Sequence, residues 1–142
     1  MAVRRNFHGL QINSTPTIVR KAGADIDDVR NLIMKYDGNG DLVLATDGTD
    51  IPVGAAIIEA GYNDISGATA GMVKKGEDVT VQIKEIGYVI AGAEIKEGQE
   101  VAAGAGGKAV PAATGNYVLG IALNSVAADG YLEVQFTKYQ KN

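Results

Sequence analysis

Val79-Thr-Val-Gln-Ile83 alternates branched apolar residues with polar ones, and Leu132-Glu-Val-Gln-Phe136 repeats this pattern near the end of the chain. Successive side chains of an extended strand point to opposite faces, so each stretch predicts a strand with one buried face. Shorter apolar runs lie between them, bounded by Gly, Pro or Asn, at residues 87–90, 100–103, 108–112 and 117–123. Runs at this spacing are typical of an antiparallel β-sandwich or barrel rather than of alternating strands and helices.

The composition favours the same fold class. The chain has 142 residues, in which 14 Val and 13 Ile outnumber 7 Leu, and there are 19 Gly. Branched side chains suit a pleated sheet, and abundant glycine indicates many turns. The length is that of one domain with a single core. We therefore expect one all-β domain, a sandwich or barrel-like fold with at most one or two short helices.

The first 24 residues differ from the rest, because their apolar residues show no sustained periodicity and Thr15-Pro16 interrupts any helix. They predict an N-terminal arm (residues 1–24), followed by the β-domain (residues 25–142). At the start of the domain, residues 25–33 have a spacing compatible with one or two helical turns. Next, two apolar runs flank Asp37-Gly-Asn-Gly40, which predicts a hairpin.

Two parts of the chain resemble each other. Pro52-Val-Gly-Ala-Ala-Ile-Ile58 precedes Gly76-Glu-Asp-Val-Thr-Val-Gln82, as Val118-Leu-Gly-Ile-Ala-Leu123 precedes Gly130-Tyr-Leu-Glu-Val-Gln135. The similarity favours a weak internal duplication, with units at about residues 37–84 and 96–137. Chance similarity between two hairpins rich in Gly and Ala is the alternative.

Residue counts exclude several kinds of chemistry. Without Cys there is no disulfide, thiolate metal site or cysteine nucleophile, and His8 is the single histidine. No apolar run is long enough to span a membrane, and the N-terminus lacks the apolar region of a secretory signal. These features predict a soluble protein made in a cytoplasm, with no membrane partner.

Charge argues against nucleic acid as a partner. The formal net charge is −4, and all four arginines lie within the first 30 residues. Residues 31–142 hold 8 Lys against 14 Asp and Glu. Because nucleic-acid binding depends on clustered basic residues, this acidic body is a poor phosphate-binding surface.

The motifs that suggest metal or nucleotide binding are incomplete. Asp37-Gly-Asn-Gly-Asp41 begins like a calcium loop, but Leu42 and Gly48 stand where such a loop needs Gly and Glu. Gly104-Ala-Gly-Gly-Lys-Ala109 lacks the first Gly and the final Ser or Thr of a phosphate-binding loop. No serine lies in a nucleophile elbow. We expect no catalytic residues, cofactor or metal, and a protein that is not an enzyme.

The order of motifs from residue 50 to 137 resembles that of the capsid cement (decoration) proteins of tailed bacteriophages. The resemblance includes Gly92-Ala-Glu-Ile-Lys-Glu-Gly98-Gln-Glu-Val101, Val118-Leu-Gly-Ile-Ala-Leu123 and Ala128-Asp-Gly-Tyr-Leu-Glu-Val134. It implies a structural protein that binds the outside of a phage head and stabilises the shell. Its partner would be the major capsid protein, and its location the capsid surface of the virion.

The first of these segments is also similar to a turn of biotinyl- and lipoyl-carrier domains and of β-clip domains. A carrier needs a modifiable lysine at a hairpin tip, and Lys108 lies at such a tip, although its neighbours differ from the carrier patterns. A carrier-like or β-clip binding domain is therefore the alternative function, and a small ligand-binding barrel is a third.

The arm is the predicted binding segment. Its apolar residues have no periodic partners in their own segment, and exposed sheet edges favour oligomer contacts. We expect a homo-oligomer, most simply a trimer, in which residues 2–21 bind a neighbouring subunit or the shell. A monomer whose arm orders only on the capsid is the alternative. The predicted contact residues are Arg4, Arg5, Phe7, Leu10, Ile12, Ile18 and Val19.

Overall fold

The computed structural model describes residues 14–142, which form ten strands and one short 3-10 turn, η1 (Ala105–Gly107). The strands make two antiparallel five-stranded sheets, so the predicted all-β fold class is confirmed. Within these residues no helix is long and apolar enough to cross a membrane.

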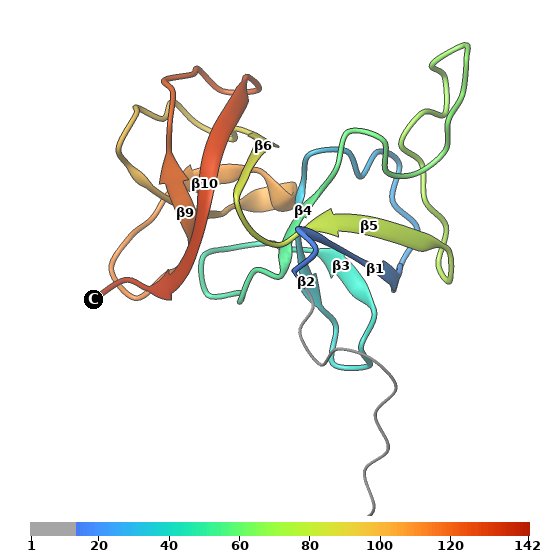
Figure 1. Cartoon of the computed structure of the whole chain (residues 1–142), viewed down its shortest axis with the longest axis horizontal. Coiled ribbons are helices and arrows are strands. Elements are labelled where there is room, and N and C mark those ends of the chain that lie inside the picture. The colour runs from blue at the N-terminus through green and yellow to red at the C-terminus, as the bar shows by residue number, and fades with distance from the viewer. Residues whose placement is uncertain (1–13) are drawn as a thin grey trace, which may run out of the picture.

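The two sheets lie side by side (Figure 1). The first has the order β1-β5-β4-β2-β3 and the second the order β6-β10-β9-β7-β8. We call them the N-unit and the C-unit. The N-unit strands are β1 (Thr17–Lys21), β2 (Ile33–Tyr36), β3 (Leu42–Leu44), β4 (Gly54–Ala56) and β5 (Asp78–Gln82). The C-unit strands are β6 (Ile86–Ile90), β7 (Glu100–Ala103), β8 (Ala109–Pro111), β9 (Tyr117–Ala122) and β10 (Tyr131–Gln140).

One strand order thus occurs twice, because β1–β5 correspond in sequence to β6–β10. A single parallel bridge closes each sheet on itself in a barrel-like way, between Ala22 and Leu42 in the N-unit and between Ala91 and Ala109 in the C-unit. The repeat in the structure runs from residue 17 to 82 and from residue 86 to 140. Both repeats begin earlier than the units at about 37–84 and 96–137 that the internal sequence similarity predicts.

A glycine recurs at the same point of each sheet. Gly54 in β4 and Gly120 in β9 lie against the strand that follows in the chain. A Cβ at Gly54 would lie 2.0 Å from the carbonyl oxygen of Gln82, and one at Gly120 would lie 2.1 Å from that of Gln135. Only glycine allows the strands to approach so closely at these two positions.

The units differ most in the connection between their last two strands. In the N-unit, residues 57–77 join β4 to β5, whereas residues 123–130 suffice between β9 and β10. The additional residues form a loop that projects away from both sheets (Figure 1).

Each unit has a hydrophobic core, and the two cores meet. The C-unit core also contains Ile33, Ala45 and Ala55 of the N-unit. Backbone hydrogen bonds join the units as well, from Ile90 N–H to the carbonyl of Asn31 and from Tyr117 N–H to that of Gly48. Largest among the fully buried side chains are Ile33, Met34, Leu42, Ile95, Leu119 and Leu132.

Near the N-terminus the structure differs from the sequence-based expectations. Part of the segment assigned to the arm is β1, which pairs with β5 about 60 residues later in the chain. Residues 25–32 form turns rather than helix, and the apolar spacing arises because Ile26, Val29 and Leu32 all pack inward. The hairpin around residues 37–40 is confirmed, with β2 and β3 antiparallel.

Candidate interaction surface

A surface groove of about 710 Å³ lies at the border between the two units, lined by N-unit residues and by Lys138 of the C-unit. Five separate segments of the chain form it: β1, β2 with its turn, the loop before β4, the end of β5 and the C-terminal half of β10. We call it the inter-unit groove. Its lining residues are Ile18, Lys35, Tyr36, Gly38, Thr49, Asp50, Ile51, Pro52, Val53, Ile83 and Lys138.

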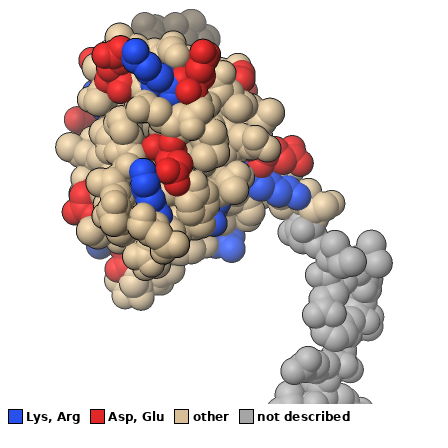
Figure 2. Space-filling model, turned by 90° about the vertical axis from the view of Figure 1, so that its left-hand side faces the viewer, with Lys and Arg blue, Asp and Glu red and all other residues tan. Residues whose placement is uncertain are grey.

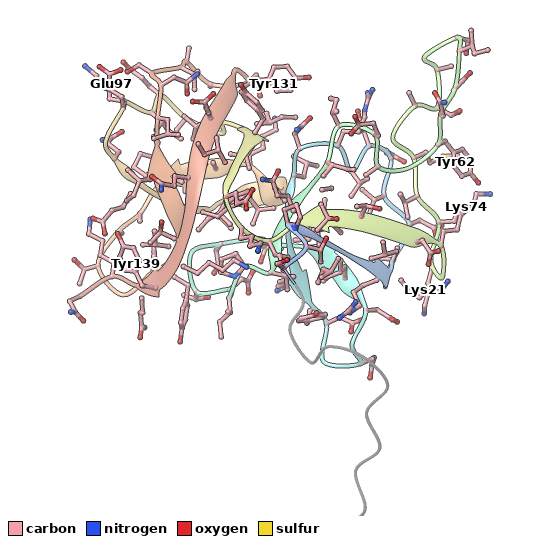
Figure 3. The ribbon with its side chains drawn as sticks, in the orientation of Figure 1. Lys21, Tyr62, Lys74, Glu97, Tyr131 and Tyr139 are labelled. Carbon is pink, nitrogen blue, oxygen red and sulfur yellow. The ribbon has the colours of Figure 1, made fainter. Side chains whose placement is uncertain are left out.

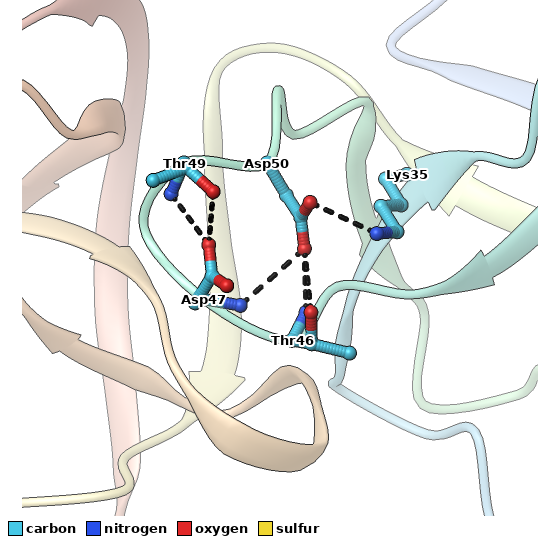
Figure 4. Close-up of polar contacts among 5 residues, drawn as sticks. All are labelled: Lys35, Thr46, Asp47, Thr49 and Asp50. Atoms are coloured by element: carbon cyan, nitrogen blue, oxygen red, sulfur yellow. Dashed lines mark hydrogen bonds and ion pairs between the residues drawn. The ribbon is translucent and has the colours of Figure 1, made fainter.

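An ion pair holds one wall of the groove together (Figure 4). Lys35 Nζ lies 2.9 Å from Asp50 Oδ1, and the two side chains are only 27% and 16% exposed. The other carboxylate oxygen of Asp50 accepts hydrogen bonds from the backbone N–H and the hydroxyl of Thr46, at 2.8 and 2.9 Å. The same oxygen accepts a third bond, from the N–H of Asp47. Asp50 therefore joins the loop before β4 to strand β2.

These contacts set the ionisation of Asp50. Burial raises the pKa of this carboxyl group, but the hydrogen bonds from Lys35, Thr46 and Asp47 outweigh burial and hold the pKa at about 2. Asp50 is thus ionised at neutral pH, and its two carboxylate oxygens are occupied by contacts with Lys35 and with its own loop. It serves as a fixed structural part of the groove wall.

Lys138 closes the groove from the C-unit side. Its ammonium donates a hydrogen bond to the carbonyl oxygen of Val53, and burial lowers its pKa. Around these polar groups the lining is largely aliphatic, with Ile51 64% exposed and Tyr36 44% exposed. The groove therefore offers apolar surface and a cation, which suits a protein segment better than a small polar substrate.

A second apolar surface lies elsewhere on the junction between the units. Ile58, Tyr88 and Tyr131 are each at least half exposed and line a hollow of about 290 Å³ together with Asn31. Asn31 is 5% exposed, and its amide donates to the carbonyl of Tyr88, while its Oδ1 has no hydrogen-bond partner among residues 14–142. We call these residues the tyrosine patch, and Tyr131 is labelled in Figure 3 at the start of β10.

The projecting loop of the N-unit carries further exposed apolar residues, Ile65 at full exposure and Tyr62 at its base (Figure 3). The Asp64 carboxylate accepts hydrogen bonds from the backbone and hydroxyl groups of both Thr69 and Ser66. These bonds lower the pKa of Asp64 to about 2. Hydrogen bonds to the ionised Asp64 carboxylate therefore hold residues 64–69 of the loop together.

Charge is evenly mixed on the C-unit face. Acidic and basic side chains lie next to one another there, separated by wide uncharged areas (Figure 2). In the C-unit, Lys141 forms an ion pair with Glu100 at 3.2 Å and Lys108 forms one with Asp129 at 2.7 Å. This face lacks the continuous positive surface that phosphate backbones require.

Of the seven predicted contact residues, Arg4, Arg5, Phe7, Leu10 and Ile12 lie outside the described residues. The other two lie in β1: Ile18 is half-buried and lines the inter-unit groove, whereas Val19 points outward and is half exposed. Sequence reasoning missed the groove and the tyrosine patch. The sequence held one signal for them, its six tyrosines, because tyrosine is typical of interfaces.

The residues considered for calcium binding form a turn. Asp37 Oδ1 accepts hydrogen bonds from the N–H groups of Asn39 and Asp41, at 2.8 and 3.2 Å. Between residues 14 and 142, no three His, Cys, Asp or Glu side chains gather as they would around a metal ion.

Lys108, the residue considered for a carrier function, is engaged in the fold. Its Nζ lies 2.7 Å from Asp129 Oδ1. The preceding Gly107 packs against β2, where an added Cβ would lie 2.8 Å from the carbonyl oxygen of Ile33. The Lys108 and Asp129 side chains are 41% and 74% exposed, so this surface pair leaves the lysine accessible and the carrier hypothesis is tested below by its modification state.

Comparisons with known proteins give a family match and a structural similarity. The family model described as "Phage cement protein" matches residues 36–136. A solved structure, the head fiber gp8.5 N base of bacteriophage phi29, is similar with a TM-score of 0.60 and 20% sequence identity. The similarity covers 89% of this chain and 97% of that chain, and at this identity it shows a shared fold alone. Comparison with curated proteins gives no match.

Proposed function

The chain belongs to the phage cement protein family, and from this premise we propose that it binds the outer surface of a phage head and stabilises the shell. It is a structural protein of a phage head, so its place is in the virion. The observation that carries the proposal is the family match, which spans more than two thirds of the chain. The partner we propose is the major capsid protein, and the role needs no catalytic group, cofactor or metal.

Self-association is the second part of the proposal. The tyrosine patch leaves Ile58, Tyr88 and Tyr131 exposed at one junction, and the inter-unit groove leaves Tyr36 and Ile51 exposed at another. Aromatic side chains with apolar neighbours are enriched at protein interfaces. We propose a homotrimer in which the tyrosine patch is buried between subunits, while the N-terminal arm binds a neighbouring subunit or the shell.

The shell-binding function can be tested with purified heads that lack this protein. The full chain should sediment with the heads at saturable stoichiometry and raise the temperature at which they break open. A protein that stays in the supernatant, or binds without any effect on heat resistance, would contradict the proposal.

Oligomeric state is tested separately, by native mass spectrometry and by light scattering of the free protein. Tyr131→Asp should shift the trimer to monomer, because a carboxylate would then be buried in an apolar contact. Tyr62→Asp is the matched control, an exposed tyrosine on the projecting loop. If the two variants behave alike, the tyrosine patch is not the trimer interface.

A further inference from the structure

The first described residues enter the fold beside the inter-unit groove. The carbonyl of Pro16 accepts a hydrogen bond from Ile83 N–H at 2.9 Å, which fixes the chain next to the end of β5. Ile83 and Ile18 both line the groove. The thirteen residues that precede the described chain are therefore tethered at the groove wall.

The groove offers exposed apolar surface to the apolar residues of the segment that precedes residue 14. Ile51 is 64% exposed and Tyr36 is 44% exposed on its rim, and the volume of about 710 Å³ accommodates several side chains. The segment outside the described residues contains three large apolar residues within six positions, Phe7, Leu10 and Ile12. Three apolar side chains suit an aliphatic groove of this volume.

We infer that the inter-unit groove is the receptor for residues 7–12 of a neighbouring copy of this chain. The inference rests on the self-association proposed above and names the surface that the arm binds. The two lysines of the lining are already engaged, Lys35 with Asp50 and Lys138 with the carbonyl of Val53. Arg4 and Arg5 precede the apolar residues of the arm, and the turn next to Gly38 carries the acidic residues Asp37 and Asp41 outside the lining.

A neighbouring copy is favoured over the same copy by the course of the first described residues. Ser14 and Pro16 are exposed, and none of residues 14–16 lines the groove. Thr15 precedes Pro16, which favours extended backbone at Thr15 over a helical turn. The described chain therefore does not lead into its own groove, and we infer that the arm of a neighbour fills it.

The arm is also long enough. Ile12 lies four residues and Phe7 nine residues before the anchored Pro16, so an extended chain carries them up to roughly 13 Å and 30 Å from that anchor at about 3.3 Å per residue. A domain of 142 residues has a radius of gyration of about 14 Å, so an arm anchored at one groove reaches across a subunit boundary. Exchange of such segments is a low-cost way to build a closed oligomer.

Cysteine cross-linking tests the inference cleanly, because the natural chain has no Cys. The double variant Leu10→Cys with Ile51→Cys is oxidised and examined on a non-reducing gel and by intact mass. We expect covalent oligomers that a reducing agent returns to monomer, since a disulfide forms only when the two Cα atoms approach within about 7 Å. Leu10→Cys with Tyr36→Cys provides a second position on the rim.

The control is Leu10→Cys with Ser125→Cys, an exposed serine of the C-unit outside the groove. We expect about tenfold less cross-linking with this pair, because its cysteines meet only by random collision. A disulfide within one chain would show that the arm fills its own groove, and equal cross-linking in test and control pairs would show no docking; either result overturns the inference. Sedimentation of the same variants with heads reports shell binding independently, so a failure of the proposed function is distinguishable.

Discussion

Replacing Asp50 by Asn should destabilise the protein by about 2 kcal/mol at pH 7. The substitution removes the ion pair with Lys35 and weakens the hydrogen bonds from Thr46 and Asp47. The difference between the ordinary pKa of 3.8 and the value of about 2 corresponds to about 2.4 kcal/mol. The remaining exposure of the carboxylate, 16%, reduces this to about 2 kcal/mol.

The effect should depend on pH in one direction. Because the pKa of Asp50 is lower in the folded state, its ionised form contributes stability above about pH 4, and this contribution disappears as the pH falls toward 2. The difference between the natural protein and Asp50→Asn should therefore be full at pH 7, about half as large at pH 3 and about one sixth as large at pH 2.

Urea unfolding followed by circular dichroism at pH 7 and pH 3 measures both quantities. The control is Asp78→Asn, which removes a solvent-exposed pair with Lys21 whose side chains are 63% and 59% exposed. Its effect should stay below about 1 kcal/mol, as is usual for surface pairs. If Asp50→Asn costs no more than this control, or if its cost is the same at both pH values, the argument from the Asp50 contacts is wrong.

Three further predictions concern the repeat and the alternative function. Gly54→Ala and Gly120→Ala should each destabilise the protein by roughly 3 kcal/mol in urea unfolding, because the added methyl group meets a neighbouring strand; a neutral result would mean that the strands separate freely there. Deletion of residues 63–70, the outer part of the projecting loop, joins Tyr62 to Gly71, whose backbones are already hydrogen-bonded, and leaves the buried Ala60 in place. It should keep the β-type circular dichroism spectrum and cooperative unfolding; loss of cooperativity would show that the outer part of the loop supports the core. Peptide mapping of the protein from its host should show Lys108 unmodified, and an adduct on Lys108 would instead favour the carrier hypothesis.

The fold class could be predicted from sequence because strand signals are local. Alternation at period two in Val79-Thr-Val-Gln-Ile83 and in Leu132-Glu-Val-Gln-Phe136 marks β5 and β10, and both strands bury the expected side chains. The turn at Asp37-Gly-Asn-Gly40 could be predicted in the same way, because the Asp37 carboxylate accepts a hydrogen bond from the backbone N–H two residues later.

The extent of the repeated strand order had a sequence signal that was overlooked. Ala22-Gly-Ala-Asp-Ile26 and Ala91-Gly-Ala-Glu-Ile95 are nearly identical, and the structure places both at equivalent bridges. In each unit the glycine N–H donates to the strand that closes the sheet, to Leu42 at 2.8 Å and to Ala109 at 2.7 Å. A search for short motifs outside the strands would have extended the units to the N-terminal side.

Local residue patterns were enough to predict a chain of short strands with many turns and few groups capable of chemistry. Those properties depend on each residue and its near neighbours. The strand order, the membership of β1 in a sheet and the inter-unit groove are instead products of the folded arrangement. Ile18, Asp50 and Lys138 come together there from positions up to 120 residues apart. Such contacts depend on which strands pair and how two cores meet, and these are non-local free-energy terms that no local pattern encodes.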